Sequence, residues 1–215
     1  TQRIQINDKV ETQERTVNTV LDTVATKVRH RDPLAQTFLI DGDLYPGGVF
    51  LKDIDLYFRE LDDNLPVRIY LASTETGIPT QRIIPFSEVQ KYPSRELAVA
   101  AGVVANGASN TEKDKHVAFG TTDASRATTF TFKSPIYLKP GTEYAVVVLS
   151  NSPNYTLWHS EVGGTDVTAG AGGQRITKNP YTGVALKSAN ASTWTPDQSK
   201  AVSYTHLTLP TTGVV

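Results

Sequence analysis

The sequence contains no cysteine and no methionine. Without cysteine there is no disulfide bridge, no thiolate nucleophile and no metal site that depends on sulfur ligands. A chain without cysteine fits assembly in a reducing cytoplasm, where disulfides are rare. Methionine is missing even at position 1, which is Thr1. We therefore expect the sequence to be an internal fragment of a longer reading frame.

Long apolar runs are also missing. The longest, residues 144–149, has the length of a strand, whereas a helix that spans a membrane needs about 18 apolar residues or more. Residues 1–4 lack the apolar core of a signal peptide. The formal net charge is -1, and a protein that binds duplex nucleic acid needs a basic face. We therefore expect neither a membrane nor a nucleic acid as partner.

Side chains that carry catalysis are scarce. The histidines are His30, His116, His159 and His206, and no two of them have the spacing of metal ligands on one helix or hairpin. The sequence has no Gly-x-Ser-x-Gly elbow and no phosphate loop that ends in Gly-Lys-Ser/Thr. The glycine-rich residues 170–173 lack the spacing of a dinucleotide site and are interpreted as linker. We therefore predict that the protein is not an enzyme and holds no cofactor and no metal.

Alternation of apolar and polar residues predicts strands between residues 32 and 162. The alternating apolar residues are Ile54, Leu56 and Phe58, then Val67, Ile69 and Leu71, then Phe130 and Phe132, continued by Ile136 and Leu138. A period of two marks a strand with one buried face. Residues 144–149 are apolar on both faces, which is typical of a central strand. Pro140-Gly141 fits the two central positions of a type II turn. At least six short strands without alternating helices predict an all-β fold, an antiparallel, jelly-roll-like β-sandwich over residues 32–162.

The flanks of this region differ in composition. Residues 1–31 carry valine and leucine at spacings of three and four, which permits a short amphipathic helix, but their Thr and Val content also fits an extended arm. Residues 97–120 are expected to form an inserted mobile loop that could hold a helical turn at 97–101. Residues 163–200 are expected to be a Gly/Thr-rich linker and the start of a following module.

The C-terminal string VSYTHLTLPT, residues 202–211, resembles a translated adapter sequence from shotgun library preparation. This resemblance implies that residues 201–215 are an extended, non-native tail and that the source is an assembled environmental read. The alternative is a natural threonine-rich strand. Following the first interpretation, we leave the tail out of the prediction of fold and function.

Three acidic clusters invite a functional interpretation. The Asp-Gly-Asp string at residues 41–43 offers carboxylates for calcium, but a calcium site needs six or more oxygen ligands, so we favour a plain turn. Asp53 and Asp55 share one face of a strand, as a pair of acid/base groups would. Alternation also places them in solvent, and this is the interpretation that we favour. Residues 62–64, Asp-Asp-Asn, predict an Asx-rich hairpin turn.

Three aromatic residues are candidates for contact with a ligand or a partner. Tyr57 and Tyr70 are expected on the outer faces of adjacent strands, where they could form a platform for stacking against a sugar. Trp158 is expected to point away from its neighbours Tyr155 and Leu157. Exposed aromatic side chains on a sheet bind carbohydrate or pack against another protein. We favour packing.

Several strings resemble virion structural proteins of contractile-tailed, T4-like phages. They are DPLAQTF (32–38), GGVFL (47–51), DLYF (55–58), IPFSEV (84–89), TFTF (129–132), SPIYL (134–138), GTEYAVV (141–147), PYTG (180–183) and KSANASTWTP (187–196). The resemblance covers residues 32–197, and the longer polar insertion at 97–120 departs from it. It implies a module of a large tail or baseplate protein, located in the virion and assembled in the host cytoplasm.

The leading hypothesis is therefore a structural module that acts through protein–protein contacts. Its partners would be other virion proteins, further domains of the same protein, or further copies of this chain in a homo-oligomer. The alternative is a carbohydrate-binding module that recognises a host surface glycan through Tyr57 and Tyr70 or through the insertion. A third hypothesis is a secreted glycosidase, which needs two carboxyl groups about 5–5.5 Å apart for retaining chemistry. The sequence offers no strong pair of this kind.

Overall fold

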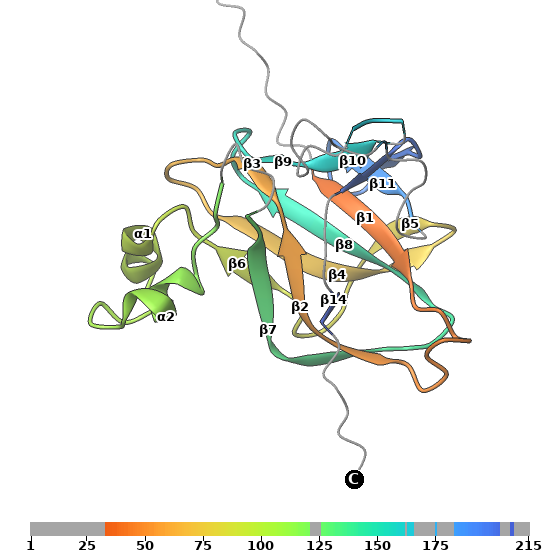
Figure 1. The fold of residues 1–215 in the computed structure, drawn as a ribbon, viewed down its shortest axis with the longest axis horizontal. Coiled ribbons are helices and arrows are strands. Elements are labelled where there is room, and N and C mark those ends of the chain that lie inside the picture. Colours follow the sequence, from red (N-terminus) through yellow and green to blue (C-terminus); the bar gives the residue numbers. More distant parts are fainter. Residues whose placement is uncertain are drawn as a thin grey trace, which may run out of the picture.

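The computed structural model describes residues 33–120, 126–161, 163–165, 175, 183–202 and 207–208. These residues form antiparallel sheets and two short helices (Figure 1). The prediction of an all-β, antiparallel fold is thereby confirmed at that level. The predicted helix or arm at residues 1–31 lies outside the described residues. Neither described helix is long and apolar enough to cross a membrane.

The elements follow one another in a simple order along the chain. They are β1 (Leu34–Leu39), β2 (Val49–Leu56), β3 (Phe58–Glu60), β4 (Val67–Glu75), β5 (Ile78–Ile83), β6 (Val89–Lys91), α1 (Arg95–Ala100), α2 (Asn110–Asp114), β7 (Thr128–Leu138), β8 (Glu143–Ser150), β9 (Thr156–Leu157), β10 (His159–Glu161), β11 (Ala185–Ser188), β12 (Trp194–Asp197), β13 (Lys200–Val202) and β14 (Leu207–Thr208).

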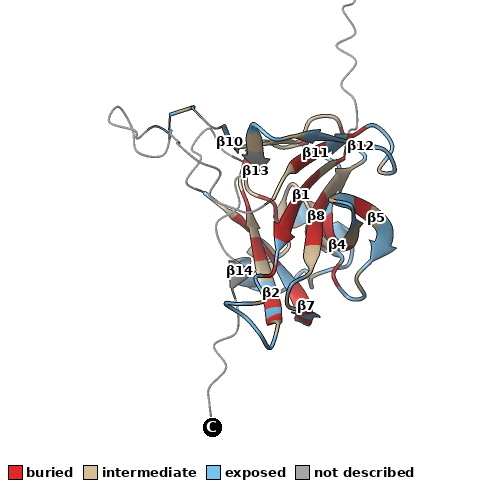
Figure 2. Ribbon diagram, turned by 90° about the vertical axis from the view of Figure 1, so that its right-hand side faces the viewer, coloured by how far each residue is buried: buried red, intermediate tan, exposed pale blue. Residues whose placement is uncertain are grey.

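The largest sheet is curled and has the strand order β12-β11-β1-β8-β4-β5, with β6 also paired to β4. Strand β8 lies between β1 and β4 and pairs with both along most of its length. Residues 144–147 of β8 are all buried, which explains why this part of the sequence is apolar on both faces. Figure 2 shows buried residues along β1, β8 and β4, whereas β5 is largely exposed.

The main core lies between this sheet and a smaller one of order β14-β2-β7. Alternation along β2 and β7 points Ile54 and Phe130 inward, where both side chains are almost fully buried. They share one core cluster with Ile69 of β4 and Val146 of β8. The predicted inward faces of these strands are therefore correct.

A second core cluster contains Ala35, Tyr70, Val147, Leu186 and Trp194. Leu186 and Trp194 belong to β11 and β12, which continue the large sheet beyond β1. Residues 163–200 were predicted to be a Gly/Thr-rich linker and the start of a following module; in the described part of that range, β11 and β12 lie in the large sheet beside β1. Strand β8 pairs with one edge of β1, and β11 pairs with the other edge, so both edges of β1 have a partner strand.

Short turns connect the strands as their residue types demand. Gly141 has φ 63°, as the type II turn predicted after β7 requires. Thr76 and Gly77 both have positive φ, which fits the tight hairpin between β4 and β5. Asp62 Oδ1 accepts hydrogen bonds from the backbone of Asn64 and Leu65, so the predicted Asx-rich turn is also present.

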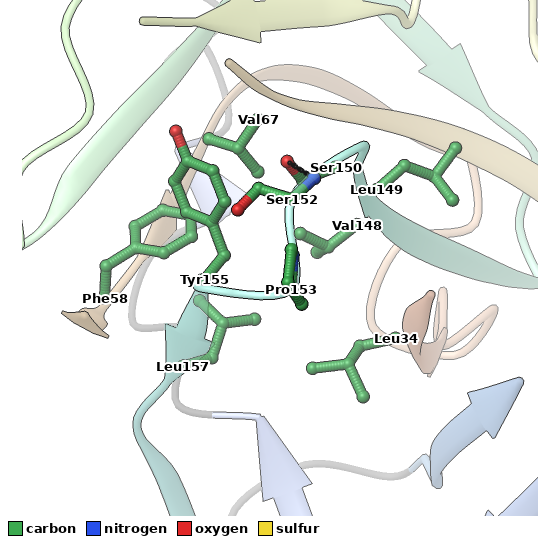
Figure 3. A pocket seen from close by; sticks show the side chains of 10 residues that line it. All are labelled: Leu34, Phe58, Val67, Val148, Leu149, Ser150, Ser152, Pro153, Tyr155 and Leu157. Atoms are coloured by element: carbon green, nitrogen blue, oxygen red, sulfur yellow. Dashed lines mark hydrogen bonds between the residues drawn. The ribbon is translucent and has the colours of Figure 1, made fainter. Parts of the chain in front are cut away.

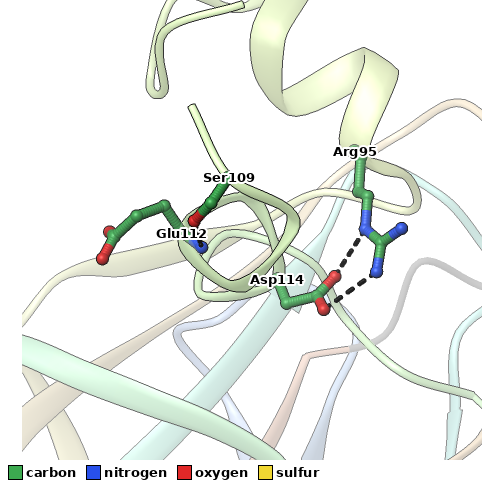
Figure 4. A network of polar contacts seen from close by, with 4 residues as sticks. All are labelled: Arg95, Ser109, Glu112 and Asp114. Atoms are coloured by element: carbon green, nitrogen blue, oxygen red, sulfur yellow. Dashed lines mark hydrogen bonds and ion pairs between the residues drawn. The ribbon is translucent and has the colours of Figure 1, made fainter. Parts of the chain in front are cut away.

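The insertion at residues 97–120 carries more structure than predicted. Helix α1 begins after Ser94, whose hydroxyl accepts a hydrogen bond from Leu97 N, and α2 begins after Ser109 in the same way. Arg95 of α1 donates to both carboxylate oxygens of Asp114 at 2.7 and 2.9 Å (Figure 4). This bidentate pair holds the two helices together at the surface.

Candidate functional site

The structure brings two of the three predicted aromatic residues together. Tyr57 lies between β2 and β3, and its carbonyl accepts a hydrogen bond from Trp158 N at 2.9 Å. The Arg59 guanidinium lies 5.5 Å from the centroid of the Trp158 ring, within the range of a cation–π contact. Tyr57 and Trp158 are both partly exposed. They remain candidates for contact with a partner or a ligand.

Tyr70 lies elsewhere and is only 7% exposed. It belongs to the second core cluster with Leu186 and Trp194, and burial raises the pKa of its hydroxyl. The expected sugar platform of Tyr57 and Tyr70 is therefore corrected, because β11 and β12 extend the sheet and help to bury the second face of β4. Alternation predicted that Tyr70 faces away from the main core, but not that this side is also buried.

Phe86 is the most exposed large apolar side chain of the described residues, at 82%. Its φ is 64°, a left-handed backbone conformation that is unfavourable for a bulky residue. The turn is fixed by buried Ser87, whose hydroxyl accepts from Leu71 N at 3.0 Å and donates to Ile84 O at 2.6 Å. The hydrogen bonds of Ser87 therefore stabilise a strained turn in which the Phe86 ring is exposed to solvent.

Phe86 was not predicted as a contact residue from the sequence. It lies in IPFSEV (84–89), one of the strings that carry the phage resemblance. The sequence does show three apolar residues around Pro85 in a segment too short for a strand, which indicates an apolar turn or loop. Exposure and positive φ, which make Phe86 a candidate contact residue, are not visible in the sequence.

A second exposed aromatic pair lies on the outer side of the small sheet. The Phe50 and Tyr137 rings have their centroids 5.3 Å apart, and both residues are about half exposed. The Tyr137 hydroxyl donates to Gly47 O at 3.2 Å. Gly48 has φ 74°, and a Cβ there would lie 2.5 Å from Leu138 O. Gly48 therefore lets this loop lie close against β7 and the Tyr137 ring.

The acidic residues of β2 lie beyond this pair on the same strand. Asp53 is opposite Thr131 and Asp55 is opposite Thr129 in the pairing with β7. Both are intermediate in exposure, so neither is the fully solvated residue that alternation predicts. Lys52 lies 3.6 Å from Asp53. Together these residues give the outer side of β2 an acidic end and an aromatic end.

A buried carboxylate joins two loops at one end of the sheets. Asp62 Oδ2 accepts from the Ser152 hydroxyl at 2.6 Å and from Asn154 Nδ2 at 2.7 Å. The Ser152 hydrogen bond, followed by those from the Leu65 and Asn64 backbone, holds the pKa of this carboxyl well below its usual range. A carboxylate with four donors is a strong structural tie rather than a poised acid or base.

One lysine is buried in the core. Lys91 is 4% exposed, its ammonium donates to Lys115 O, and it lies 5.9 Å from the Phe130 ring centroid. Burial lowers its pKa to about 8, partly opposed by the charge of Asp53. The lysine therefore ties the end of α2 to the main core.

The Asp-Gly-Asp string forms the plain turn that we favoured. Asp41 Oδ1 accepts from Asp43 N at 2.8 Å and from Leu44 N at 3.3 Å. Within the described ranges, no three His, Asp or Glu side chains are grouped as metal ligands would be.

The described surface has one small hollow and one larger groove of interest. The hollow holds about 50 Å³ and lies beside the Phe58 and Tyr155 rings (Figure 3), far less than the roughly 300 Å³ of a small ligand pocket. The groove holds about 440 Å³ and includes the polar side chains of Arg68, Gln90 and Asn190. A further hollow of about 380 Å³ lies between α1 and α2 beside Arg95 and Lys113, so this hollow and the groove both reach the size of a small ligand site, whereas the hollow beside Phe58 does not.

No protein-family model, no curated protein and no solved structure matches this sequence.

Proposed function

We propose that this chain is a non-enzymatic structural module of a phage tail or baseplate protein and acts through protein–protein contacts. The observation that carries the proposal is Phe86, which a strained turn keeps 82% exposed. An aromatic side chain gains most from burial, so holding it in solvent by a costly backbone conformation is understandable if a partner covers it. The phage resemblance of the residues around it gives the partner its class.

The sandwich belongs to the same proposal. The small sheet of β2 and β7 packs over the curled sheet with the main core between them, and we assign this arrangement to a jelly-roll-like sandwich. Two packed sheets make a stiff support whose loops and turns can meet neighbours in fixed positions. The partners are other virion proteins, further domains of the same protein, or further copies of this chain.

The proposal is tested by immunogold microscopy of viral concentrates in which the coding sequence is detected. One antibody is raised against residues 84–89, which contain Phe86, and a matched one against residues 95–114, which contain helices α1 and α2. We expect the antibody against residues 95–114 to label the tail ends of intact particles. We expect the Phe86 antibody to label them only after the particles are dissociated. Absence of label from particles in both states overturns the virion assignment. Equal labelling by both antibodies before dissociation overturns the role of Phe86.

The groove beside Arg68 keeps carbohydrate binding as a second candidate. Its volume of about 440 Å³ and its amide and guanidinium groups fit a small glycan. A glycan array with the full chain tests it, with Arg68→Ala and Trp158→Ala as paired variants. Loss of a specific signal in R68A alone assigns the glycan to the groove, and loss in W158A alone assigns it to the Tyr57–Trp158 pair. An array without specific binding removes this candidate.

A further inference from the structure

We propose that the edge of β2 opposite β7 accepts an extended basic and apolar segment of another protein, which adds to it as an antiparallel strand. The inference rests on the proposed function for its protein partner, and it names the type of segment and where it binds. Strand addition uses backbone hydrogen bonds for affinity and alternate side chains for specificity.

The pairing of β2 is one-sided. Strand β7 covers one edge from Val49, opposite Leu138, to Leu56, opposite Thr128. The other edge is paired only at Asp53 and Ile54, with β14, in the part of the chain that the structure describes. The remaining backbone groups of that edge are a template for another strand.

This edge of β2 already pairs with one short strand, β14. Leu207 lies opposite Ile54 and Thr208 opposite Asp53, in antiparallel register. Strand β14 belongs to residues 201–215, the tail that resembles a translated adapter sequence. Within the described residues two positions pair there, so a longer segment with a matching pattern has more hydrogen bonds to gain from the same edge.

The side chains beside the edge define the partner. Phe50 and Tyr137 form an exposed aromatic pair near the start of β2. Asp53 and Asp55 place two carboxylates near its end, against the single ammonium of Lys52, which lies 3.6 Å from Asp53 Oδ2. Opposite charges and aromatic pairs stabilise neighbouring strands, whereas like charges destabilise them. In antiparallel addition, the complementary segment carries Lys or Arg in its N-terminal half and an aromatic or aliphatic residue near its C-terminal end.

A second copy of the chain is a poorer occupant. If two β2 strands paired about Ile54, each Asp53 would lie opposite an Asp55 of the other copy, which is a like-charge contact. Charge complementarity therefore favours a different, basic segment.

The experiment uses the full chain and fluorescent nine-residue peptides. The test peptide alternates valine with two lysines in its N-terminal half and has phenylalanine near its C-terminal end. One control replaces the lysines by glutamate, and another carries N-methyl groups on alternate amides. Leu207→Pro is the matched protein variant, because it removes an N–H from the competing β14; its circular dichroism spectrum checks that it folds.

We expect the lysine peptide to bind about tenfold more tightly than the glutamate peptide, since two pairs change from attraction to repulsion. Asp55→Asn should weaken the lysine peptide several-fold, N-methylation should abolish binding, and L207P should strengthen it. Amide NMR shifts should concentrate in β2. Equal binding of both charged peptides, equal binding of the N-methyl peptide, or no binding to L207P overturns the proposal.

Shifts of β2 amides that depend on protein concentration without peptide would assign the edge to a second copy instead. The outcome is independent of the immunogold experiment. That experiment reads the location of the chain, whereas this one reads strand addition, so failure of one is distinguishable from failure of the other.

Discussion

The Ser152 hydroxyl donates to Oδ2 of Asp62 at 2.6 Å and thereby joins the turn after β8 to the turn after β3. The two residues are 90 positions apart in the sequence. Asn154 makes a second contact to the same oxygen, and the Asp62 side chain is buried at the junction. One carboxylate therefore cross-links two loops whose flanking strands are also paired, β3 with β9 and β4 with β8.

Asp62→Ala should destabilise the fold, because it removes the acceptor of four hydrogen bonds and leaves polar donors behind. We expect a loss of about 2–4 kcal/mol in the free energy of unfolding. Asp63→Ala is the matched control, since Asp63 is exposed, and it should change the free energy by less than about 0.5 kcal/mol. Urea denaturation at pH 7 measures both. Similar values for the two variants would contradict the role of Asp62.

The contribution of Asp62 should depend on pH. Its pKa is lowered in the folded state from an ordinary value of 3.8, so the stabilisation is fully present above that value and is lost as the pH falls below it. The difference in unfolding free energy between wild type and D62A should stay constant from pH 7 to pH 5 and shrink at pH 4 and pH 3. A difference that grows on acidification would show the opposite sign of the pKa shift.

Gly48→Ala and Gly47→Ala form a matched pair in the β1–β2 loop. A Cβ at Gly48 would lie 2.5 Å from Leu138 O at φ 74°, whereas a Cβ at Gly47 meets nothing within 4 Å. We expect G48A to cost about 1–3 kcal/mol and G47A to be neutral or slightly stabilising. Thermal denaturation distinguishes them, and a stable G48A protein would mean that the loop can move away from β7.

Phe86→Gly should make the chain more stable. Glycine adopts φ 64° without the steric cost that phenylalanine has there, and the exposed ring contributes little burial. We expect a gain of about 1 kcal/mol from relief of this strain. Ser87→Ala, at a fully buried position in the same turn, should cost about 1–3 kcal/mol. If F86G destabilises the chain as much as S87A, Phe86 packs in the isolated chain and is not reserved for a partner.

Lys91→Met should change how stability depends on alkaline pH. Burial lowers the pKa of Lys91 from 10.5 to about 8, so between these values the unfolded chain holds a proton that the folded chain has lost. Wild type should therefore gain stability relative to K91M as pH rises from 8 to 10.5, by up to about 3 kcal/mol. Chemical denaturation at pH 7.5, 9 and 10 measures the difference. A flat difference would show that the folded lysine keeps its proton.

The sequence predicted those parts of the fold that depend on local pattern. Alternation identified the inward faces of β2 and β7, and Pro140-Gly141 identified the turn between β7 and β8. Tyr70 was misplaced because period-two alternation separates two faces of a strand without saying whether a second core covers the outer one. Strands β11 and β12 were missed because Ala185–Ser188 has little apolar surface of its own and becomes a strand by pairing with β1.

The candidate contact residues depend on still less local information. Tyr57 and Trp158 were predicted as surface aromatics, and their proximity arises from the pairing of β3 with β9. Phe86 required knowledge of a backbone angle that Ser87 fixes through contacts with β4. Such features are set by residues distant in sequence, so a single sequence without pairing information does not specify them.

The place of β1 in the sheet also bears on synthesis of the chain. The Thr37 hydroxyl accepts a hydrogen bond from Val184 N, and these residues are 147 positions apart. A ribosome that adds about 5–20 residues per second needs roughly 7–30 s between them. Throughout that interval the nascent chain carries a β1 edge without its final neighbour. That edge is then a template for strands of other chains, so a chaperone that covers it during translation should raise the yield of correctly assembled protein.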